Sequence, residues 1–438
     1  MNIIIIGAGK VGFNLAKKLS IAHNVTVIDI NSEALHRIQE EIDILVLNGD
    51  AEDINTYREI KTIDIDLFIA VTNIDNTNLV SSLVAESILH INKKIIRLKK
   101  EYFDYEEIKI KFNIDKFIFP VELASKAIDS LLTYPKANNV KFFKHTNYEL
   151  ISIMIPNSFK SIKFIQSHYR LIGIERDKKF HIVSSHSVLI EPNDLLYLFA
   201  LEDNIVELYK ILGIDSKLDI RNCVVVGGSS LGIAIAKRLS NAKCSVKLLE
   251  KDVKLCEEAN TKLKGKVNII NTKYNSHDIF KSEALYNADM FVSTTVDDEF
   301  NIIKSLEAKE NGIKKIVAIN NDLEYYGLMH SLGITVIRGP KISAYNKIME
   351  EINSSKIVIQ KNFCGSKAIL LIRKIFSGSL LIGMKINPIV YKGMILFYIR
   401  DERLNLFDSN ITLQKGDLIV SFAVNVDSHR VKKWLYEL

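Results

Sequence analysis

Short apolar runs alternate with amphipathic stretches over the first 133 residues of the chain. Fully apolar runs of four to six residues, separated by amphipathic segments, are typical of buried parallel strands joined by helices. Such a series predicts a doubly wound α/β sheet. The predicted strands are residues 3–6, 25–28, 44–47, 67–71, 94–97 and 116–119, and the longer predicted helices are 12–22, 32–41 and 76–89.

The whole pattern occurs twice, and an internal repeat of this length determines the architecture. Residues 3–12 read IIIIGAGKVG, and residues 223–232 read CVVVGGSSLG. In each copy the pattern then changes to short strands rich in Ile, Leu, Phe and Tyr, which predicts a small α+β domain. The turn before Leu195 (Pro-Asn-Asp) is matched by the turn before Leu418 (Lys-Gly-Asp), so the repeat includes the small domains.

The fold class expected is therefore α/β, with two doubly wound Rossmann-type domains, each followed by a small α+β domain. The Rossmann-type domains are predicted at residues 1–133 and 220–350. The small domains are predicted at residues 140–212 and 357–438. The predicted linkers are residues 133–140, 213–219 and 353–356.

Composition excludes several classes of protein. The net charge of +6 is not gathered into a dense basic cluster with interleaved aromatic residues, which disfavours nucleic-acid binding. The four cysteines have no zinc-ligand spacing, so we expect buried thiols in a reducing cytosol and no metal site. No stretch has about 18 uncharged apolar residues and no signal peptide is expected, so any action at a membrane is peripheral.

The first glycine-rich loop, GAGKVG, directly follows a predicted strand and opens a helix. Gly7 permits the tight turn, Gly9 allows a pyrophosphate to approach the backbone, and Gly12 allows the helix to pack closely on the strand. Asp29 ends the next strand, where a carboxylate accepts hydrogen bonds from ribose hydroxyls and repels a 2′-phosphate. These features predict an NAD or adenine-nucleotide site, against the alternative of a Rossmann-type domain that binds nothing.

The second loop, GGSSLG, starts at Gly227 and ends at Gly232, and Glu250 stands at the acid position. Ser229 replaces the middle glycine, and its side chain crowds the place of a pyrophosphate. A structural copy with weak or no binding is therefore an equal alternative for the second domain.

Polar residues also follow the third and fourth strands, at the edge where such sheets bind ligands. Asp50 either contacts adenine or caps the next helix, and its counterpart segment around Thr272 has lost the acid. The polar side chains of Thr72, Asn73, Asp75 and Asn78 face the phosphates in one interpretation. In the other, Asn73 or Asp75 caps a helix.

The fifth strand ends in Arg97, which either binds a phosphate as a planar fork or is a solvated basic residue. The second copy has no arginine there.

No catalytic constellation accompanies these loops. His145, His168, His181 and His186 are scattered among strand residues of the first small domain, and the chain has no HExxH, GxSxG or P-loop sequence. A dehydrogenase needs a proton-transfer group beside the nicotinamide. The chain is therefore expected to bind a nucleotide without transforming it, and a tandem Rossmann NAD-dependent dehydrogenase is the alternative.

The strings IIIIGAGKVG, VTVIDIN, NGDAED, AVTNIDNTN and IIRLKKEYFD resemble the TrkA family, the regulatory subunits of bacterial Trk-type potassium uptake systems, whose domains are of the RCK (KTN) type. The resemblance covers essentially the whole chain. It implies a peripheral protein on the cytoplasmic face of the inner membrane, a homo-oligomeric ring (a tetramer) and a Trk-type membrane subunit as partner. It also implies that NAD(H) and ATP or ADP bind the Rossmann-type domains and change the shape of the ring.

The resemblance assigns the candidate ligands by motif match. In the first copy the loop Gly7, Ala8, Gly9, Lys10, Val11 and Gly12 would hold phosphates, Asp29 the ribose, Asp50 and Ala51 the adenine, and Thr72, Asn73 and Arg97 the distal phosphates. In the second copy the candidates are Gly227, Ser229, Gly232, Glu250 and Thr295.

Overall fold

The computed structural model describes the chain except for residues 61–63, 100–102, 104, 144, 167–169, 214–219, 274–278, 354–357, 390–392 and 425–427. The candidate His168 and most of the predicted linkers 213–219 and 353–356 lie outside the described residues. The chain divides into two compact units. The first contains residues 1–126, 229–234 and 338–349, and the second contains residues 127–228, 235–337 and 350–438.

The first unit is built on a six-stranded sheet with the order β3-β2-β1-β5-β7-β8, in which the strands pair in parallel. This is the strand order of a doubly wound Rossmann-type fold, as predicted. The strands are β1 (Asn2–Ile6), β2 (Asn24–Asp29), β3 (Leu45–Asn48), β5 (Leu67–Ala70), β7 (Lys94–Arg97) and β8 (Lys116–Ile118); β4 (Asp64–Ile65) and β6 (His90–Ile91) form a separate short pair. The helices are α1 (Lys10–Leu19), α2 (Ser32–Glu41), α3 (Ile54–Arg58), α4 (Asp75–Glu86), α5 (Glu106–Lys111) and α6 (Pro120–Ser125).

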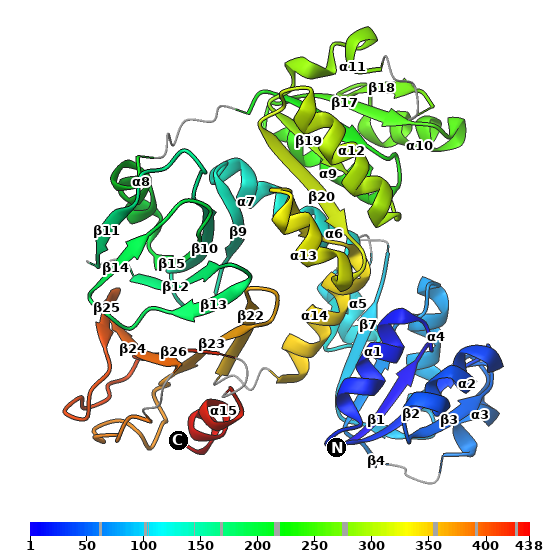
Figure 1. Ribbon diagram of the computed structural model, residues 1–438. Coiled ribbons are helices and arrows are strands. Elements are labelled where there is room, and N and C mark those ends of the chain that lie inside the picture. The colour runs from blue at the N-terminus through cyan, green and yellow to red at the C-terminus, as the bar shows by residue number, and fades with distance from the viewer. Residues whose placement is uncertain are drawn as a thin grey trace. The chain divides into compact units, whose positions relative to one another are not determined.

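Helices cover both faces of this sheet (Figure 1), and they bury the side chains of its central strands on both sides. Ile4 and Ile6 of β1 belong to a core with Leu79 and Ala85 of α4. The alternate residue Ile5 faces α1, because a side chain added at Gly12 would lie 3.5 Å from it. Strands buried on both faces need uninterrupted apolar sequence, and this is the pattern that predicted them.

The second Rossmann-type sheet has the same strand order, β18-β17-β16-β19-β20-β21. The fold class of two such sheets, each followed by a small domain, is confirmed. The strands are β16 (Asn222–Val226), β17 (Ser245–Glu250), β18 (Asn268–Asn271), β19 (Met290–Ser293), β20 (Lys315–Asn320) and β21 (Thr335–Arg338). The helices are α9 (Ser230–Asn241), α10 (Val253–Leu263), α11 (Ile279–Ser282), α12 (Asp298–Glu310), α13 (Tyr326–Ser331) and α14 (Pro340–Asn353), with 3-10 turns at Leu285–Asn287 and Leu323–Tyr325.

Each small domain has a five-stranded antiparallel sheet, and the two sheets share one topology: β9-β10-β15-β12-β13 and β22-β23-β26-β24-β25. The first domain has α7 (Ala127–Thr133), β9 (Ala137–Lys141), β10 (Glu149–Met154), β11 (Ile162–Ile165), β12 (Arg170–Arg176), β13 (Lys179–Ile182), β14 (Ser187–Ile190), β15 (Leu195–Ala200) and α8 (Glu202–Ile211). The second has β22 (Val358–Phe363), β23 (Ala368–Lys374), β24 (Met394–Arg400), β25 (Arg403–Leu406), β26 (Leu418–Val424) and α15 (Ser428–Glu437). One prediction is wrong here, because the second half of the expected linker 133–140 belongs to β9, whose residues pair with β10.

The two small domains pack on each other within the second unit through one aromatic core, which includes Tyr197, Phe199, Phe363 and Phe422. The duplicated turns carry matching ion pairs. Asp194 receives a bidentate pair of hydrogen bonds from Arg176, and Asp417 receives the same pair from Arg400. Both aspartates are buried, so the matching turns predicted from sequence have a structural role. Among the described helices, none is long and apolar enough to cross a bilayer.

Candidate functional site

The first glycine loop follows β1 and turns directly into α1. Gly7 has φ +105°, a conformation that L side chains rarely adopt, and a side chain there would lie 3.1 Å from the amide nitrogen of Thr72. A side chain at Gly12 would meet the carbonyl oxygen of Gly7 at 1.8 Å. The protein itself therefore requires glycine at both positions.

Gly9 differs from Gly7 and Gly12, because no contact within the protein requires a glycine at this position. It is the N-cap of α1 in extended backbone with φ −67°, and an added side chain would meet no atom within 4 Å. Any residue could adopt this conformation. The first N–H groups of a helix lack partners inside the helix and attract an anion. Open space beside such groups is the arrangement that a bound pyrophosphate needs.

Asp29 lies beside the loop at the end of β2. Its carboxylate accepts hydrogen bonds from the backbone of Ala8 at 2.6 Å and of Asn31 at 2.8 Å. The side chain is only partly buried, and each carboxylate oxygen has a second lone pair. Asp29 can therefore hold the loop in place and still accept a hydrogen bond from a ribose hydroxyl.

The turn after β3 places Asp50 and Ala51 side by side, but Asp50 does not cap the next helix. Its Oδ1 accepts the N–H of Glu52 at 2.9 Å, and Asp53 caps α3 by accepting the N–H of Asn55. Ala51 is buried, and its carbonyl accepts the hydroxyl of Tyr57 at 2.7 Å. Burial raises the pKa of Tyr57, so this phenol stays neutral and keeps the turn fixed.

Asn78 fixes the backbone after β5 through its side-chain hydrogen bonds, a role that its position in the sequence did not show. It is fully buried, and its amide oxygen accepts both the N–H and the hydroxyl of Thr72, at 2.9 and 2.6 Å. Its amide nitrogen donates to the carbonyls of Thr72 and Arg97. Neither predicted cap is correct, because the N-cap of α4 is Ile74 and Asp75 accepts the N–H of Lys99.

Arg97 is buried, so the interpretation as a solvated basic residue is wrong. Its Nη1 donates to the carbonyls of Val71 and Thr72 and to the side chain of Asn73. Its Nε is buried and has no hydrogen-bond partner among the described residues. Burial lowers the pKa of Arg97, while Asp75 opposes that shift. A buried guanidinium with an unused N–H group can donate a hydrogen bond to an anion such as a phosphate.

The second copy keeps the framework of this site but fills the space around the acid. Glu250 is buried, its Oε2 accepts the N–H of Gly228 at 2.5 Å, and its Oε1 accepts the N–H groups of Lys251 and Asp252. A side chain at Gly228 would lie 2.9 Å from the Cγ atom of Glu250. The longer acid therefore takes the place that the methyl group of Ala8 holds in the first copy.

Equivalent hydrogen bonds identify the other exchanges between the copies. The N–H of Gly49 donates to the carbonyl of Asp29, as the N–H of Thr272 donates to the carbonyl of Glu250, so Lys273 occupies the position of Asp50.

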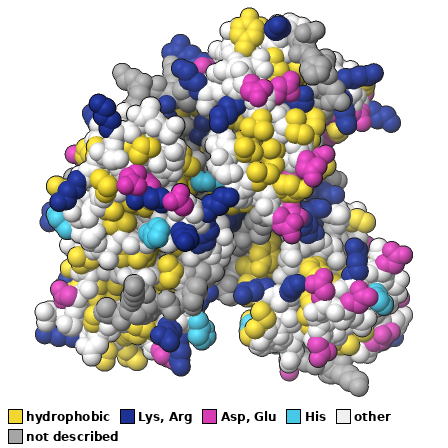
Figure 2. All heavy atoms as spheres, in the orientation of Figure 1, with side chains coloured by type: hydrophobic (Ala, Val, Ile, Leu, Met, Phe, Trp, Pro, Cys, Tyr) yellow, Lys and Arg dark blue, Asp and Glu magenta, His cyan; other side chains and the backbone are white. Residues whose placement is uncertain are grey.

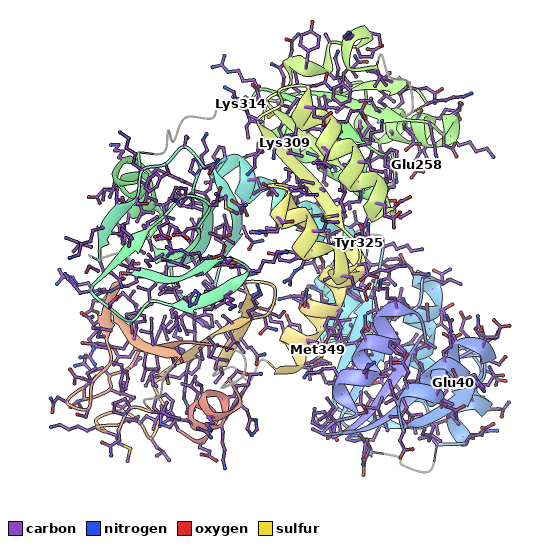
Figure 3. All side chains as sticks on the ribbon, in the orientation of Figure 1. Glu40, Glu258, Lys309, Lys314, Tyr325 and Met349 are labelled. Atoms are coloured by element: carbon purple, nitrogen blue, oxygen red, sulfur yellow. The ribbon has the colours of Figure 1, made fainter. Side chains whose placement is uncertain are left out.

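At the other strand ends, Asn301 holds Thr295 as Asn78 holds Thr72, and it also bonds the carbonyl of Ile319. Ile319 is therefore the counterpart of Arg97, and Asn321 supplies the hydrogen bond to the Thr295 carbonyl instead. Tyr325, labelled in Figure 3, donates to Glu299 in the same region.

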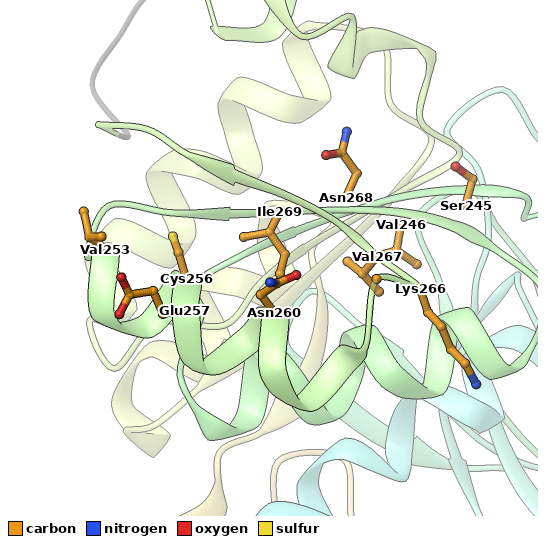
Figure 4. Close-up of a pocket in the computed structure, with 11 residues that line it drawn as sticks. Ser245, Val246, Val253, Cys256, Glu257, Asn260, Lys266, Val267, Asn268 and Ile269 are labelled. Carbon is orange, nitrogen blue, oxygen red and sulfur yellow. The ribbon is translucent and has the colours of Figure 1, made fainter.

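An open pocket of about 700 Å³ lies beside α10 and β18 of the second copy (Figure 4). Its lining includes Cys256, Glu257, Asn260 and Asn268, and none of the predicted nucleotide ligands. The candidate site is therefore defined by the loop geometry and not by this pocket. No group of three or more His, Cys, Asp or Glu side chains able to hold a metal occurs among the described residues.

The strand order, the glycine loop and the acid at the end of β2 define a tandem Rossmann-type protein. The chain belongs to the TrkA-N domain family, whose model matches residues 3–120 and again residues 223–340. Both matches coincide with the two parallel sheets.

Relatives and solved structures agree with this assignment. The Trk system potassium uptake protein TrkA of Vibrio alginolyticus is 27% identical over 372 residues, covering 82% of this chain and 80% of the relative. A TrkA homolog of Archaeoglobus fulgidus is 25% identical and is covered over 97% of both chains. The GsuK channel bound to NAD has a TM-score of 0.63 at 14% identity, covering 100% of this chain and 79% of that one, and therefore shows the fold alone.

Proposed function

We propose that this chain is a nucleotide-binding regulatory subunit of a Trk-type potassium uptake system and that it binds NAD(H), ATP or ADP in its first Rossmann-type domain. The observation that carries this proposal is the open, extended Gly9 between two glycines that the fold itself requires. Gly9 serves no packing purpose, so its use is best explained by a ligand that approaches the backbone there.

The roles of the other ligands follow from their places around the loop. Asp29 binds the ribose, Asp50 and Ala51 flank the adenine, and Thr72, Asn73 and Arg97 contact the distal phosphates. Ala8, Lys10 and Val11 contribute backbone. The unused Nε of Arg97 supports its role. The second copy, with Gly227, Ser229, Gly232, Glu250 and Thr295, binds the same ligand weakly or not at all.

The comparisons favour a regulator over a dehydrogenase. The relatives above are named as potassium uptake proteins. One GsuK structure is titled as bound to NAD and another as bound to ADP. Among the described residues, His145 of the first small domain lies 3.3 Å from the Nζ of Lys374, in the second small domain.

Regulation would be a coupling free energy between nucleotide and membrane subunit. A nucleotide that binds one conformation better than another shifts the population by its differential affinity. A tenfold preference corresponds to about 1.4 kcal/mol at each site. The domains predicted from sequence, at residues 1–133, 140–212, 220–350 and 357–438, would shift in this change, with the two small domains moving together because they share one aromatic core.

The assembly proposed is a homo-oligomeric ring, a tetramer, on the cytoplasmic face of the inner membrane. Ile74 at the start of α4 and Val80 and Leu83 within it are exposed apolar residues on the first Rossmann-type domain. Such residues suit a subunit contact, and the Trk-type membrane subunit is the partner on which the ring would act.

The test is potassium flux through the Trk membrane subunit in vesicles, with this chain added in the presence or absence of NADH or ATP. The flux should depend on nucleotide with the wild-type chain and lose that dependence with Gly9→Val, which the open space at Gly9 should accommodate. Ser229→Val is the matched control and should leave the dependence intact. Nucleotide-dependent flux that survives Gly9→Val would overturn the proposal.

A further inference from the structure

The second small domain carries an exposed apolar turn between β23 and residue 386. Leu380 is 90% exposed, and Met384, Ile382 and Phe376 are exposed beside it. The turn is nevertheless ordered by its own backbone, since Met384 donates to Leu381 and Gly383 donates to Leu413. Leu381 and Ile386 point inward and belong to the core of this domain. The turn therefore holds apolar side chains toward solvent on a fixed base.

The first small domain shows that the fold does not require this apolar surface. Ile155 and Ile375 occupy equivalent positions, because they make the same hydrogen bonds to the duplicated turn. The carbonyl of each accepts a backbone N–H of the turn, and the N–H of each donates to the carbonyl of the buried aspartate. Lys163 pairs with Leu189 and Lys385 pairs with Thr412, so Phe164 and Ile386 are equivalent as well. Between these points the first copy reads IPNSFKSIKF, whereas the second reads IFSGSLLIGMKI. The second copy is two residues longer and replaces a polar segment by Leu380, Leu381 and Ile382. Exposing apolar side chains opposes the usual preference, so the exchange points to a partner.

The charge around the turn identifies the kind of partner. Residues 352–400 contain eight Lys and Arg and no Asp or Glu, although Lys361, Lys367 and Arg400 pair with acids outside this segment and Arg373 is buried. Residues 357–438 contain twelve Lys and Arg against six Asp and Glu, an excess that equals the +6 of the whole chain.

Three of these lysines are close to the turn. Lys374 and Lys385 bracket it in sequence, and Lys415 precedes Gly416, which donates to the carbonyl of Ile375. None of the three forms an ion pair with a described acid; the Nζ of Lys374 lies 3.3 Å from the Nδ1 of His145 and 5.6 Å from the ring centre of Phe376. On the face drawn in Figure 2, hydrophobic and basic side chains adjoin at the lower left, where Figure 1 draws β24 and β25.

We propose that the turn 376–384 inserts Leu380, Ile382 and Met384 into the interfacial region of an anionic phospholipid bilayer, while Lys374, Lys385 and Lys415 contact the lipid headgroups. An apolar tip with a basic base is the chemistry of interfacial membrane binding, in which buried apolar area and attraction to anionic lipid add together. The tip is too small for a stable protein interface, which takes about 20–30 residues a side.

The experiment measures binding of the full-length chain to vesicles without any membrane subunit or nucleotide, so its failure would not bear on the proposed regulatory function. The wild-type chain should co-sediment with vesicles of phosphatidylglycerol and phosphatidylethanolamine. It should bind at least tenfold less to phosphatidylcholine vesicles and less in high salt, because salt screens headgroup attraction.

The double variant Leu380→Asn with Met384→Asn should bind anionic vesicles at least tenfold less than the wild-type chain. The matched control is Ile165→Asn with Leu189→Asn, which changes two exposed apolar residues of the first small domain and should bind as the wild-type chain does. As a second readout, Leu380→Trp should show a blue shift of its fluorescence on anionic vesicles, and Leu189→Trp should not.

Three results would overturn the proposal. One is a wild-type chain that ignores anionic vesicles. Another is a tip variant that binds them as well as the control does. The third is a tip variant whose sedimentation velocity shows a smaller oligomer than the wild type, since the turn would then be a contact between copies of this chain.

Discussion

The two Rossmann-type domains share one framework and differ at the positions that a nucleotide would touch. In both, a buried asparagine, Asn78 or Asn301, ties the end of one strand to the next with the same set of hydrogen bonds. In the first domain Gly9 is open and Arg97 has an unused donor. In the second, Ser229 and Ile319 stand there. The hydrogen-bonded framework is therefore common to both copies, whereas the open glycine and the arginine belong to the first copy.

The exchange of the acid shows how such a divergence is accommodated. Asp29 faces Ala8, and the longer Glu250 faces Gly228, so a methylene group has moved from one partner to the other. The local packing stays full, because close-packed interiors tolerate swaps that conserve volume best. The carboxylate that is partly exposed in the first copy is buried in the second.

The largest effect is expected for Gly12→Ala. The added methyl group would meet the carbonyl oxygen of Gly7 at 1.8 Å, so helix α1 must move away from the sheet. We expect a loss of about 3 kcal/mol or more in the free energy of unfolding. Chemical denaturation followed by circular dichroism measures it. Gly9→Ala is the control and should change stability by less than about 1 kcal/mol, so equal losses in both variants would show that Gly9 has a structural role.

Arg97→Met should lower nucleotide affinity about tenfold to a hundredfold, because a charged hydrogen bond to phosphate is lost. Titration calorimetry with NADH measures the change, with thermal unfolding recorded to separate lost binding from lost folding. Ile319→Met is the matched variant in the second copy and should have no effect on affinity. An unchanged affinity in folded Arg97→Met would remove Arg97 from the site.

Gly228→Ala should destabilise the chain by about 1–3 kcal/mol, because its methyl group would overlap the side chain of Glu250. Adding Glu250→Asp restores the pair found in the first copy and should recover at least half of that loss. A double-mutant cycle on denaturation free energies measures the coupling. Additive losses would mean that the two positions do not share one space.

The smallest effect is expected on the pH dependence of stability, and it concerns two buried lysines, Lys94 in β7 and Lys315 in β20. Lys94 pairs with Glu86, whereas Lys315 donates to the carbonyl of Ala137, and burial beside Lys136 lowers the pKa of Lys315 to about 7. The unfolded chain keeps this lysine protonated to about pH 10, so the folded state binds fewer protons and stability should rise between about pH 7 and 10. Lys315→Met should raise the melting temperature at pH 7 and lose that gain near pH 10. The control Lys94→Met should lower it, and a gain from Lys315→Met that is independent of pH would contradict this account.

Apolar pattern and glycine spacing predicted both parallel sheets, because buried strands need continuous apolar sequence. The bounds of α2 and β7 were predicted without error. The linker at 133–140 failed, because β9 contains Asn138 and Asn139 and lacks the usual apolar signal of a strand. The burial of Arg97 at the end of β7 and of Asn78 in the first turn of α4 was also missed, since polar residues at such positions are ordinarily solvated and only the tertiary fold encloses them.

Titration calorimetry of the purified full-length chain with NADH tests the central comparison most directly, through the number of ligands bound per chain. We expect one NADH per chain, unchanged by Ser229→Val and abolished by Gly9→Val, with both variants folded. Two equivalent ligands per chain, or one ligand whose binding survives Gly9→Val and disappears with Ser229→Val, would contradict the assignment of the nucleotide to the first domain.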